Sequence, residues 1–367
     1  MYKANSWLIF VTLLAGFSAC SGKPDNALLL DPSPGNPRNS EGDFIQLSDG
    51  KTLFVYTHFT EGMDDYAGAF LAGRYSSDGG KTWTDKDQMI LKNEGMMNIM
   101  SVSLLRLNKE TIALFYLVKN NETDCRPFAR YSIDESQSWS DPVSIMNDTI
   151  CYAVVNNDRV VLLSGGRIIV PAAIHNSPAQ NRFDNHGDVV CYFSDNTGKS
   201  WSRSRSALKN KSVILQEPGI VELGDDRLMM YCRTNAGFQY ISYSGDLGDT
   251  WTEMEPSNIS SFMSPAAIER IPSTGDLLLV WNYREENDTE ITTKRSPLCT
   301  AVSMDEGKTW ILRKILESEP DHWYCYPAVE FLEDQILLGY CAGSRETGNG
   351  LQSLKISRLP VQWIYEE

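Results

Sequence analysis

The chain has 367 residues, with 48 acidic and 33 basic side chains, a formal net charge of -15 and 42% hydrophobic residues. This composition is that of a folded soluble protein and excludes the low-hydrophobicity disordered class. The negative charge disfavours nucleic acid and anionic lipid as partners, because few cations remain to neutralise phosphates. The 26 Gly, 16 Tyr and 9 Trp favour strands and turns over a helical bundle.

Residues 1–20 have the order of an export signal. Lys3 precedes an apolar run from Trp7 to Phe17, which is too short to span a bilayer, and small residues follow. The ending Phe17-Ser18-Ala19-Cys20 resembles a bacterial lipobox. The resemblance implies lipidation of Cys20 and an exported lipoprotein of a bacterial envelope, at the outer membrane and facing either the periplasm or the cell surface. Residues 21–39, rich in Pro, Gly, Asn and Ser, are expected to form a flexible tether.

Seven cysteines follow Cys20, without a Cys-x-x-Cys pair. Their odd number and spacing indicate neither a zinc knuckle nor a full disulfide ladder. Most lie in apolar runs such as Met230-Tyr231-Cys232, so we interpret them as small buried hydrophobic residues. The four His are scattered, and the sequence contains neither an EF-hand spacing nor a phosphate-binding loop. The sequence therefore predicts no metal and no cofactor.

A repeated motif indicates the architecture. Five segments share the pattern Ser-x-Asp-x-Gly-x-Thr-Trp, with Ser136 in place of Gly in the second copy and Asn196 in place of Asp in the third. These residue types suit a hairpin turn, because Asp and Ser bond local backbone groups, Gly adopts positive φ and Trp packs beside the strand. The copies occupy residues 76–83, 132–139, 194–201, 244–251 and 303–310.

The copies begin 50 to 62 residues apart, which suits the four-stranded blade of a propeller and gives about six units. Paired strands joined by an Asp-Gly-like turn are expected at 43–58, 102–116, 160–173, 220–231, 266–281 and 328–340. Residues 351–364 lack the motif and are expected to complete the sixth blade, with an N-terminal strand closing the ring. We therefore predict an all-β, six-bladed β-propeller over residues 40–367 as a single domain.

The repeat is the Asp-box, or BNR, motif, and the chain resembles the bacterial sialidase (neuraminidase) family over nearly all of its length after the signal. Asp boxes are typical of a propeller but specify no activity, because they lie on the outer rim, away from the axis. The resemblance implies an exo-α-sialidase-like glycoside hydrolase that acts on sialylated glycans or other acidic-sugar glycoconjugates. We expect a monomer that contacts the membrane only through its lipid anchor.

The family binds the sugar carboxylate with three arginines, whose planar guanidinium groups match a carboxylate bidentately. Arg233 directly follows an apolar strand and Arg295 precedes the strand into the fifth box, so they match the second and third family arginines. The family's N-terminal Arg-Ile-Pro is missing, and only Arg38 stands at a comparable distance before an Asp-Gly turn. An Arg-Ile-Pro at 270–272 lies in the fifth unit, and we treat it as coincidence.

The resemblance also implies the catalytic groups. A neutral tyrosine nucleophile activated by Glu avoids the repulsion that a carboxylate would meet from an anionic substrate. Tyr326 matches the family's nucleophile, with Tyr324 as the alternative, and Glu217 matches its partner. The family's general acid is an Asp on the loop before the first box, which here is Asp65 or Asp64, with Asp65 preferred.

Two other functions remain open. A hydrolase of the same fold that cleaves another acidic sugar would explain the missing Arg-Ile-Pro. A carbohydrate-binding propeller without catalysis is favoured by Glu41 and Asp43 near Arg38, because an extra carboxylate at the clamp opposes an anionic sugar.

Overall fold

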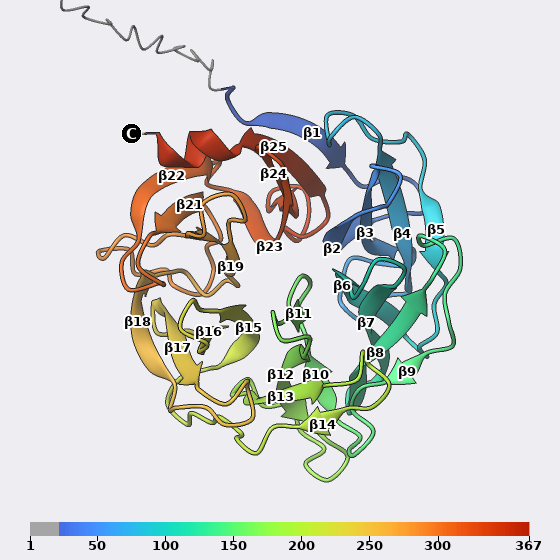
Figure 1. Ribbon diagram of the computed structural model, residues 1–367, viewed down its shortest axis with the longest axis vertical. Coiled ribbons are helices and arrows are strands. Elements are labelled where there is room, and N and C mark those ends of the chain that lie inside the picture. Colours follow the sequence, from blue (N-terminus) through green and yellow to red (C-terminus); the bar gives the residue numbers. More distant parts are fainter. Residues whose placement is uncertain (1–21, 367) are drawn as a thin grey trace, which may run out of the picture.

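The computed structural model describes residues 22–366 and confirms the predicted all-β class. The strands form five hydrogen-bonded sheets that are arranged around a common centre (Figure 1). One short 3-10 helix, η1 (Val361–Tyr365), follows the last strand. No helix within residues 22–366 combines the length and apolar character needed to cross a bilayer. The predicted signal segment and Cys20 lie outside the described residues.

Four of the sheets have four strands each, and neighbouring strands within them are antiparallel. The first contains β2 (Arg38–Gln46), β3 (Thr52–Phe59), β4 (Ala69–Ser76) and β5 (Gln88–Leu91). Another contains β15 (Gln216–Glu222), β16 (Leu228–Arg233), β17 (Phe238–Ser244) and β18 (Glu255–Ser260). A third contains β19 (Ala267–Arg270), β20 (Leu277–Trp281), β21 (Leu298–Ser303) and β22 (Ile311–Glu317). The last contains β23 (His322–Leu332), β24 (Gln335–Ser344), β25 (Leu354–Pro360) and β1 (Asp25–Leu30).

The fifth sheet has nine strands, where the sequence predicted two separate units. One parallel pairing, between Tyr152 in β10 and Cys125 in β8, joins two groups of antiparallel strands. The first group is β6 (Asn98–Arg106), β7 (Ile112–Asn121), β8 (Asp124–Ser132) and β9 (Val143–Ser144). The second is β10 (Tyr152–Val154), β11 (Val161–Leu162), β12 (Ile168–Asn176), β13 (Asp188–Ser194) and β14 (Ser202–Arg203).

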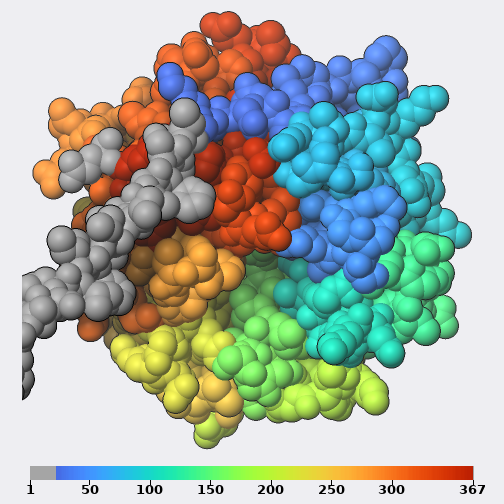
Figure 2. Space-filling model, turned by 45° about the horizontal axis from the view of Figure 1, so that its top comes forward, coloured from blue at the N-terminus to red at the C-terminus, as the bar shows by residue number. Residues whose placement is uncertain are grey.

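The N-terminal segment is a strand of the last sheet. β1 pairs antiparallel with β25, from Asp25 opposite Arg358 to Leu30 opposite Leu354. The N-terminal segment (blue) lies against the C-terminal part of the chain (red) in Figure 2. This corrects the predicted tether at 21–39, because residues 25–30 form β1 and β2 already begins at residue 38. Pairing satisfies the free edge of β25 and buries Leu30, which outweighs the turn-rich composition of the segment.

The apolar core is divided into six clusters, each between two neighbouring groups of strands. β3 shows how one strand serves two clusters, because Leu53 and Val55 belong to one and Phe54 and Tyr56 to the next. Successive side chains of a strand point to opposite faces, so a sheet packed on both sides has a nearly continuous hydrophobic sequence. The core therefore holds the inner strands rigidly around the centre.

The Asp-box turns begin at the last residue of β4, β8, β13, β17 and β21. In the first, the Ser76 hydroxyl donates to Asp78 Oδ1 at 2.9 Å and accepts the Gly80 N–H at 2.9 Å. Asp78 also accepts the backbone N–H and the hydroxyl of Thr82. The same hydroxyl bond to the third residue of the motif recurs in the other four copies. Each motif thus fixes a turn by local bonds alone.

We expect the first box to make stability depend on pH. Hydrogen bonds from Thr82 and Ser76 lower the pKa of Asp78 to about 2, although burial alone would raise it. A folded-state pKa below the unfolded value contributes stability above about pH 4, and this contribution is lost as the pH falls towards 2. Asp78→Asn is therefore expected to lower the free energy of unfolding by about 0.5–1 kcal/mol at pH 6, after allowance for solvent screening. Chemical denaturation at a series of pH values measures this difference.

The difference between wild type and Asp78→Asn should shrink towards zero at pH 2.5. Asp85→Asn, an exposed position just beyond the same box, removes the same charge and serves as the control. A difference that does not vary with pH would contradict the assignment.

Candidate active site

Four inner strands carry a β-bulge at corresponding places. The register shifts lie between Ser40 and Asp43 in β2, Met100 and Ser103 in β6, Gln216 and Gly219 in β15, and Cys325 and Ala328 in β23. Each bulge contains a non-glycine residue with positive φ, namely Glu41 (52°), Ser101 (59°), Glu217 (50°) and Tyr326 (57°). A bulge redirects its side chain, and the strained backbone is retained where a site needs that direction. All four residues line one cavity of about 310 Å³.

Tyr326 and Glu217 form a pair within this cavity. The Tyr326 hydroxyl donates to Glu217 Oε1 at 3.4 Å, and Arg233 Nη1 donates to Glu217 Oε2 at 2.7 Å. Burial, followed by the charge of Glu217, raises the pKa of Tyr326 above its ordinary value. The phenol is therefore protonated at neutral pH, and attack by its oxygen requires a neighbouring base. The structure brings the predicted nucleophile, its predicted partner and Arg233 together.

Arg295 lines the same cavity and is 7% exposed. Its guanidinium carbon lies 4.4 Å from the centre of the Trp323 ring and 5.3 Å from that of Tyr326. Its Nη1 donates to the Cys325 sulfur at 3.1 Å. Burial would raise the pKa of Cys325, but Cys341 and the charge of Arg295 lower it to about 7. Arg295 is thus held by aromatic faces and a polarised thiol.

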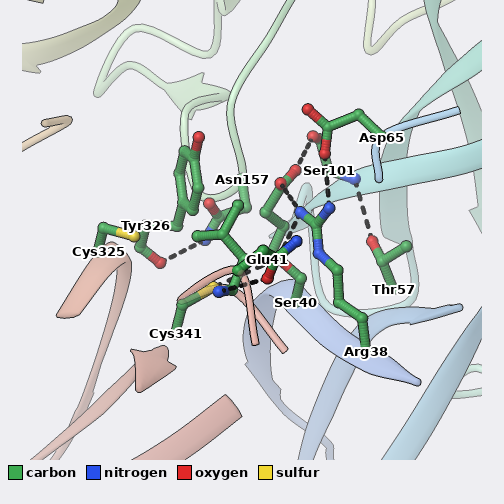
Figure 3. Close-up of polar contacts among 12 residues, drawn as sticks. Arg38, Ser40, Glu41, Thr57, Asp65, Ser101, Asn157, Cys325, Tyr326 and Cys341 are labelled. Atoms are coloured by element: carbon green, nitrogen blue, oxygen red, sulfur yellow. Dashed lines mark hydrogen bonds and ion pairs between the residues drawn. The ribbon is translucent and has the colours of Figure 1, made fainter. Parts of the chain in front are cut away.

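The Arg38 guanidinium contacts two carboxylates, those of Asp65 and Glu41, as Figure 3 shows. Its Nη1 donates to Asp65 Oδ1 at 2.6 Å and its Nη2 to Glu41 Oε1 at 3.2 Å. Arg38 is 1% exposed and does not line the cavity, whereas Asp65 and Glu41 do. The Arg38 guanidinium is therefore already paired with Asp65, which lines the cavity. The sequence did not indicate this, because Asp65 and Arg38 are 27 residues apart.

Glu41 is a buried carboxylate with two partners. Besides Arg38, it accepts a hydrogen bond from the Ser101 hydroxyl. Burial raises the pKa of Glu41 above its ordinary value, although the charge of Arg38 lowers it. The carboxylate that the sequence suggested would oppose an anionic sugar is therefore paired with the charge of Arg38 and hydrogen-bonded by Ser101.

The loop that carries Asp65 is held by hydrogen bonds from two side chains of neighbouring strands. The Lys119 ammonium donates to the Asp65 carbonyl at 2.7 Å, and the Asn98 amide donates to the carbonyls of Asp65 and Ala67 at 2.9 and 2.8 Å. The Asp65 side chain is 53% exposed. Partial burial raises the pKa of Asp65, but the nearby charges of Arg38 and Lys119 outweigh it and lower the pKa. Asp65 is therefore ionised at neutral pH.

The alternatives that the sequence offered lie elsewhere. Asp64 is exposed, does not line the cavity and accepts the N–H of Tyr66 at 2.8 Å. Tyr324 is 3% exposed and packs in an apolar cluster. Arg270, of the second Arg-Ile-Pro, forms an ion pair with Glu306 at 2.7 Å. Of these three side chains, none contributes to the cavity.

Sequence reasoning missed Lys119 and His175, which line the cavity, and Asn98, whose amide holds the loop of Asp65. Lys119 ends the apolar run Ile112–Val118, and a single cation at the end of a buried strand is a usable signal. The sequence around Asn98 and His175 contains no comparable signal. Within residues 22–366, no three His, Cys, Asp or Glu side chains are grouped so as to hold a metal ion. The seven cysteines of this part of the chain are buried with free thiols.

The fold and the site together define an all-β protein with a central cavity lined by arginines, carboxylates and a tyrosine. Residues 94–338 match the family described as BNR repeat-like domain. Because this match covers more than half of the chain, the chain belongs to this BNR-repeat family. The predicted resemblance to bacterial sialidases is confirmed by this match together with the relatives and solved structures that follow.

Individual relatives are distant. The sialidase of Clostridium perfringens is 25% identical over 240 residues, which are 58% of this chain and 60% of the relative. The sialidase of Bacteroides fragilis is 27% identical over 206 residues, 52% of this chain but 35% of the relative. The matches thus span less than two thirds of either relative. The intramolecular trans-sialidase of Ruminococcus gnavus, solved with oseltamivir carboxylate, superposes with a TM-score of 0.70 at 16% identity, over 93% of this chain and 98% of that one. At this identity the similarity shows the fold alone.

Proposed function

We propose that the chain is an exo-α-sialidase-like glycoside hydrolase that releases terminal sialic acid from glycoconjugates with retention of configuration. The contact that carries this proposal is the hydrogen bond from Tyr326 to Glu217 at 3.4 Å, in a cavity also lined by Arg233 and Arg295. The cavity volume of about 310 Å³ suits a single sugar unit at the end of a glycan.

The residues have complementary roles in this proposal. Tyr326 attacks the anomeric carbon while its proton passes to Glu217, and Asp65 gives a proton to the leaving oxygen. Water then cleaves the tyrosyl glycoside and passes a proton to Asp65, while Glu217 returns its proton to the phenolate. Two displacements at one carbon retain its configuration.

Binding of the carboxylate is shared unequally among the arginines. Arg233 and Arg295 line the cavity, and we assign them the first contacts with the sugar carboxylate. Arg38 joins them when the substrate carboxylate takes the place of Asp65 on its Nη1 atom. This exchange frees Asp65 and puts a negative charge near it, which favours its protonated form.

A second candidate function is hydrolysis of a different acidic sugar. The observation that favours it is Glu41, a buried carboxylate on the cavity wall. A carboxylate on the cavity wall disfavours sugars that place a negatively charged group beside it, and it favours sugars that place a hydrogen-bond donor there. The third possibility is a carbohydrate-binding protein without catalytic activity. The experiment below distinguishes it from the two hydrolases.

We also propose that the fold is a six-bladed β-propeller that runs from β1 to η1 and is closed by the pairing of β1 with β25, in which the nine-stranded sheet counts as two blades. The six apolar clusters between strand groups support this count. A signal over residues 1–20, lipidation of Cys20, an outer-membrane location and a monomeric state remain part of the proposal.

The test is a panel of fluorogenic α-glycosides of sialic acid and of other acidic sugars, with release of the fluorophore as the measurement. We expect turnover of the sialoside, and NMR of the first-formed sugar should show the α-anomer. Turnover of another acidic sugar alone would favour the second candidate. Binding of sialylated glycans without turnover of any glycoside would overturn the enzymatic proposal.

A further inference from the structure

We infer that the Nε2 atom of His175 accepts a hydrogen bond from a hydroxyl group of the bound acidic sugar, an inference that rests on the proposed function. His175 lies near the end of β12, lines the cavity and is 2% exposed. Its Nε2 has no hydrogen-bond partner among the described residues. A buried polar atom without a partner is unusual in a folded protein, and a ligand is one way to satisfy it.

The protonation state of the ring follows from its other nitrogen. His175 Nδ1 lies 2.8 Å from the backbone carbonyl oxygen of Asp184. A carbonyl oxygen only accepts, so Nδ1 carries the proton. Burial lowers the pKa of His175, although the hydrogen bond to Asp184 and the charge of Glu217 raise it. The ring is therefore neutral at neutral pH, and Nε2 presents a lone pair.

The ring is also fixed in orientation. The Asp184 N–H donates to the His175 carbonyl at 2.8 Å, so this residue holds His175 at two points. Phe183 stacks on the imidazole with ring centres 5.0 Å apart and planes at 10°. A Cβ atom at Gly187 would lie 2.9 Å from His175 Cε1, so only glycine lets the chain pass this closely. Turning Nε2 elsewhere would break the bond to Asp184.

The position suits a sugar hydroxyl. A sugar whose carboxylate is bound by Arg233 and Arg295 extends towards the other walls, which include Lys119, Tyr152 and His175. Lys119 can only donate hydrogen bonds, whereas the neutral His175 offers an acceptor. Sugar hydroxyls donate readily, and a site that hydrogen-bonds a substrate hydroxyl discriminates against analogues that lack it. His175 is therefore assigned as a substrate-binding and specificity-determining residue.

The test measures binding of 2,3-didehydro sialic acid and of analogues that each lack one hydroxyl, by titration calorimetry with the full chain. We expect wild type to bind the parent about tenfold more tightly than one of the analogues. His175→Asn keeps a donor at the place of Nδ1 but removes the acceptor, so it should bind both compounds with equal, weaker affinity. His175→Gln, whose longer amide can reach the place of Nε2, should restore part of the discrimination.

His186→Asn is the matched control, because His186 lies on the loop between β12 and β13, is 39% exposed and does not line the cavity. It should bind like wild type. A second measurement needs no variant: the ¹⁵N resonance of His175 Nε2, one of four histidines, should shift towards its hydrogen-bonded value when wild type binds the parent. Unchanged discrimination in His175→Asn, or an unshifted resonance on binding, would overturn this inference alone. Failure of wild type to bind the parent would overturn the proposed function, and this inference with it.

Discussion

Replacing Tyr326 by Phe is expected to reduce kcat on a sialoside by about 10³-fold or more, with KM changed little. The substitution removes one oxygen, which in the proposed mechanism forms the bond to the sugar. Burial and the charge of Glu217 raise the pKa of Tyr326, so the hydroxyl is activated only through its 3.4 Å contact with Glu217. Steady-state kinetics and trapping of a covalent intermediate measure the loss.

Tyr324→Phe is the matched control for this experiment. Tyr324 stands two residues earlier on β23, is 3% exposed and does not line the cavity. We expect it to retain activity within about threefold of wild type, with a similar unfolding temperature. Equal losses in the two variants would point to a general effect on folding, and full activity in Tyr326→Phe would exclude Tyr326 as the nucleophile.

Asp65→Asn is expected to reduce kcat on natural glycosides, whose leaving groups are poor, by about 10²- to 10⁴-fold. The loss should be much smaller on aryl glycosides, because a good leaving group departs without a proton. Asp64→Asn, at the exposed neighbouring carboxylate, should keep the wild-type activity. The comparison of the two substrate classes identifies the acid, and an equal loss on both classes would assign Asp65 to binding instead.

If Asp65 is the general acid, the direction in which activity changes with pH can be predicted. The charges of Arg38 and Lys119 lower the pKa of Asp65 in the free protein, against the effect of partial burial. A general acid must be protonated, so activity falls as the pH rises through its pKa. When the substrate carboxylate replaces Asp65 on Arg38, Asp65 loses this stabilising charge and its pKa rises. The falling limb of kcat should therefore lie at higher pH than that of kcat/KM, which reports the free enzyme. If the falling limbs of kcat and kcat/KM lie at the same pH, the proposed replacement of Asp65 by the substrate carboxylate on Arg38 is contradicted.

Much of the site was predictable because its residues belong to recognisable local patterns. Tyr326, Glu217, Arg233 and Arg295 were matched to positions of the family's motifs within or next to apolar strands, and the structure places all four around one cavity. The prediction for Arg38 was incomplete, because the sequence placed Glu41 near this residue but did not indicate its contact with Asp65. Its contact with Asp65 depends on where the loop after β3 folds back, and no local pattern specifies that.

The tether was mispredicted for a related reason. Composition favours a flexible segment at 21–39, yet residues 25–30 gain their hydrogen bonds from β25, more than 300 residues later. A strand that depends on a distant edge has little local signature beyond three leucines, Leu28, Leu29 and Leu30.

The sequence by itself determined the paired strands beside the Asp boxes and the Asp-box turns, because runs of apolar side chains and bonds between Ser, Asp and Thr act within a few residues. Only the tertiary structure decided which side chains face the cavity. Glu41, Ser101, Glu217 and Tyr326 point there because a bulge in each strand shifts the register against its neighbour. Register is a property of two paired strands, and the cavity exists only where several such pairs converge.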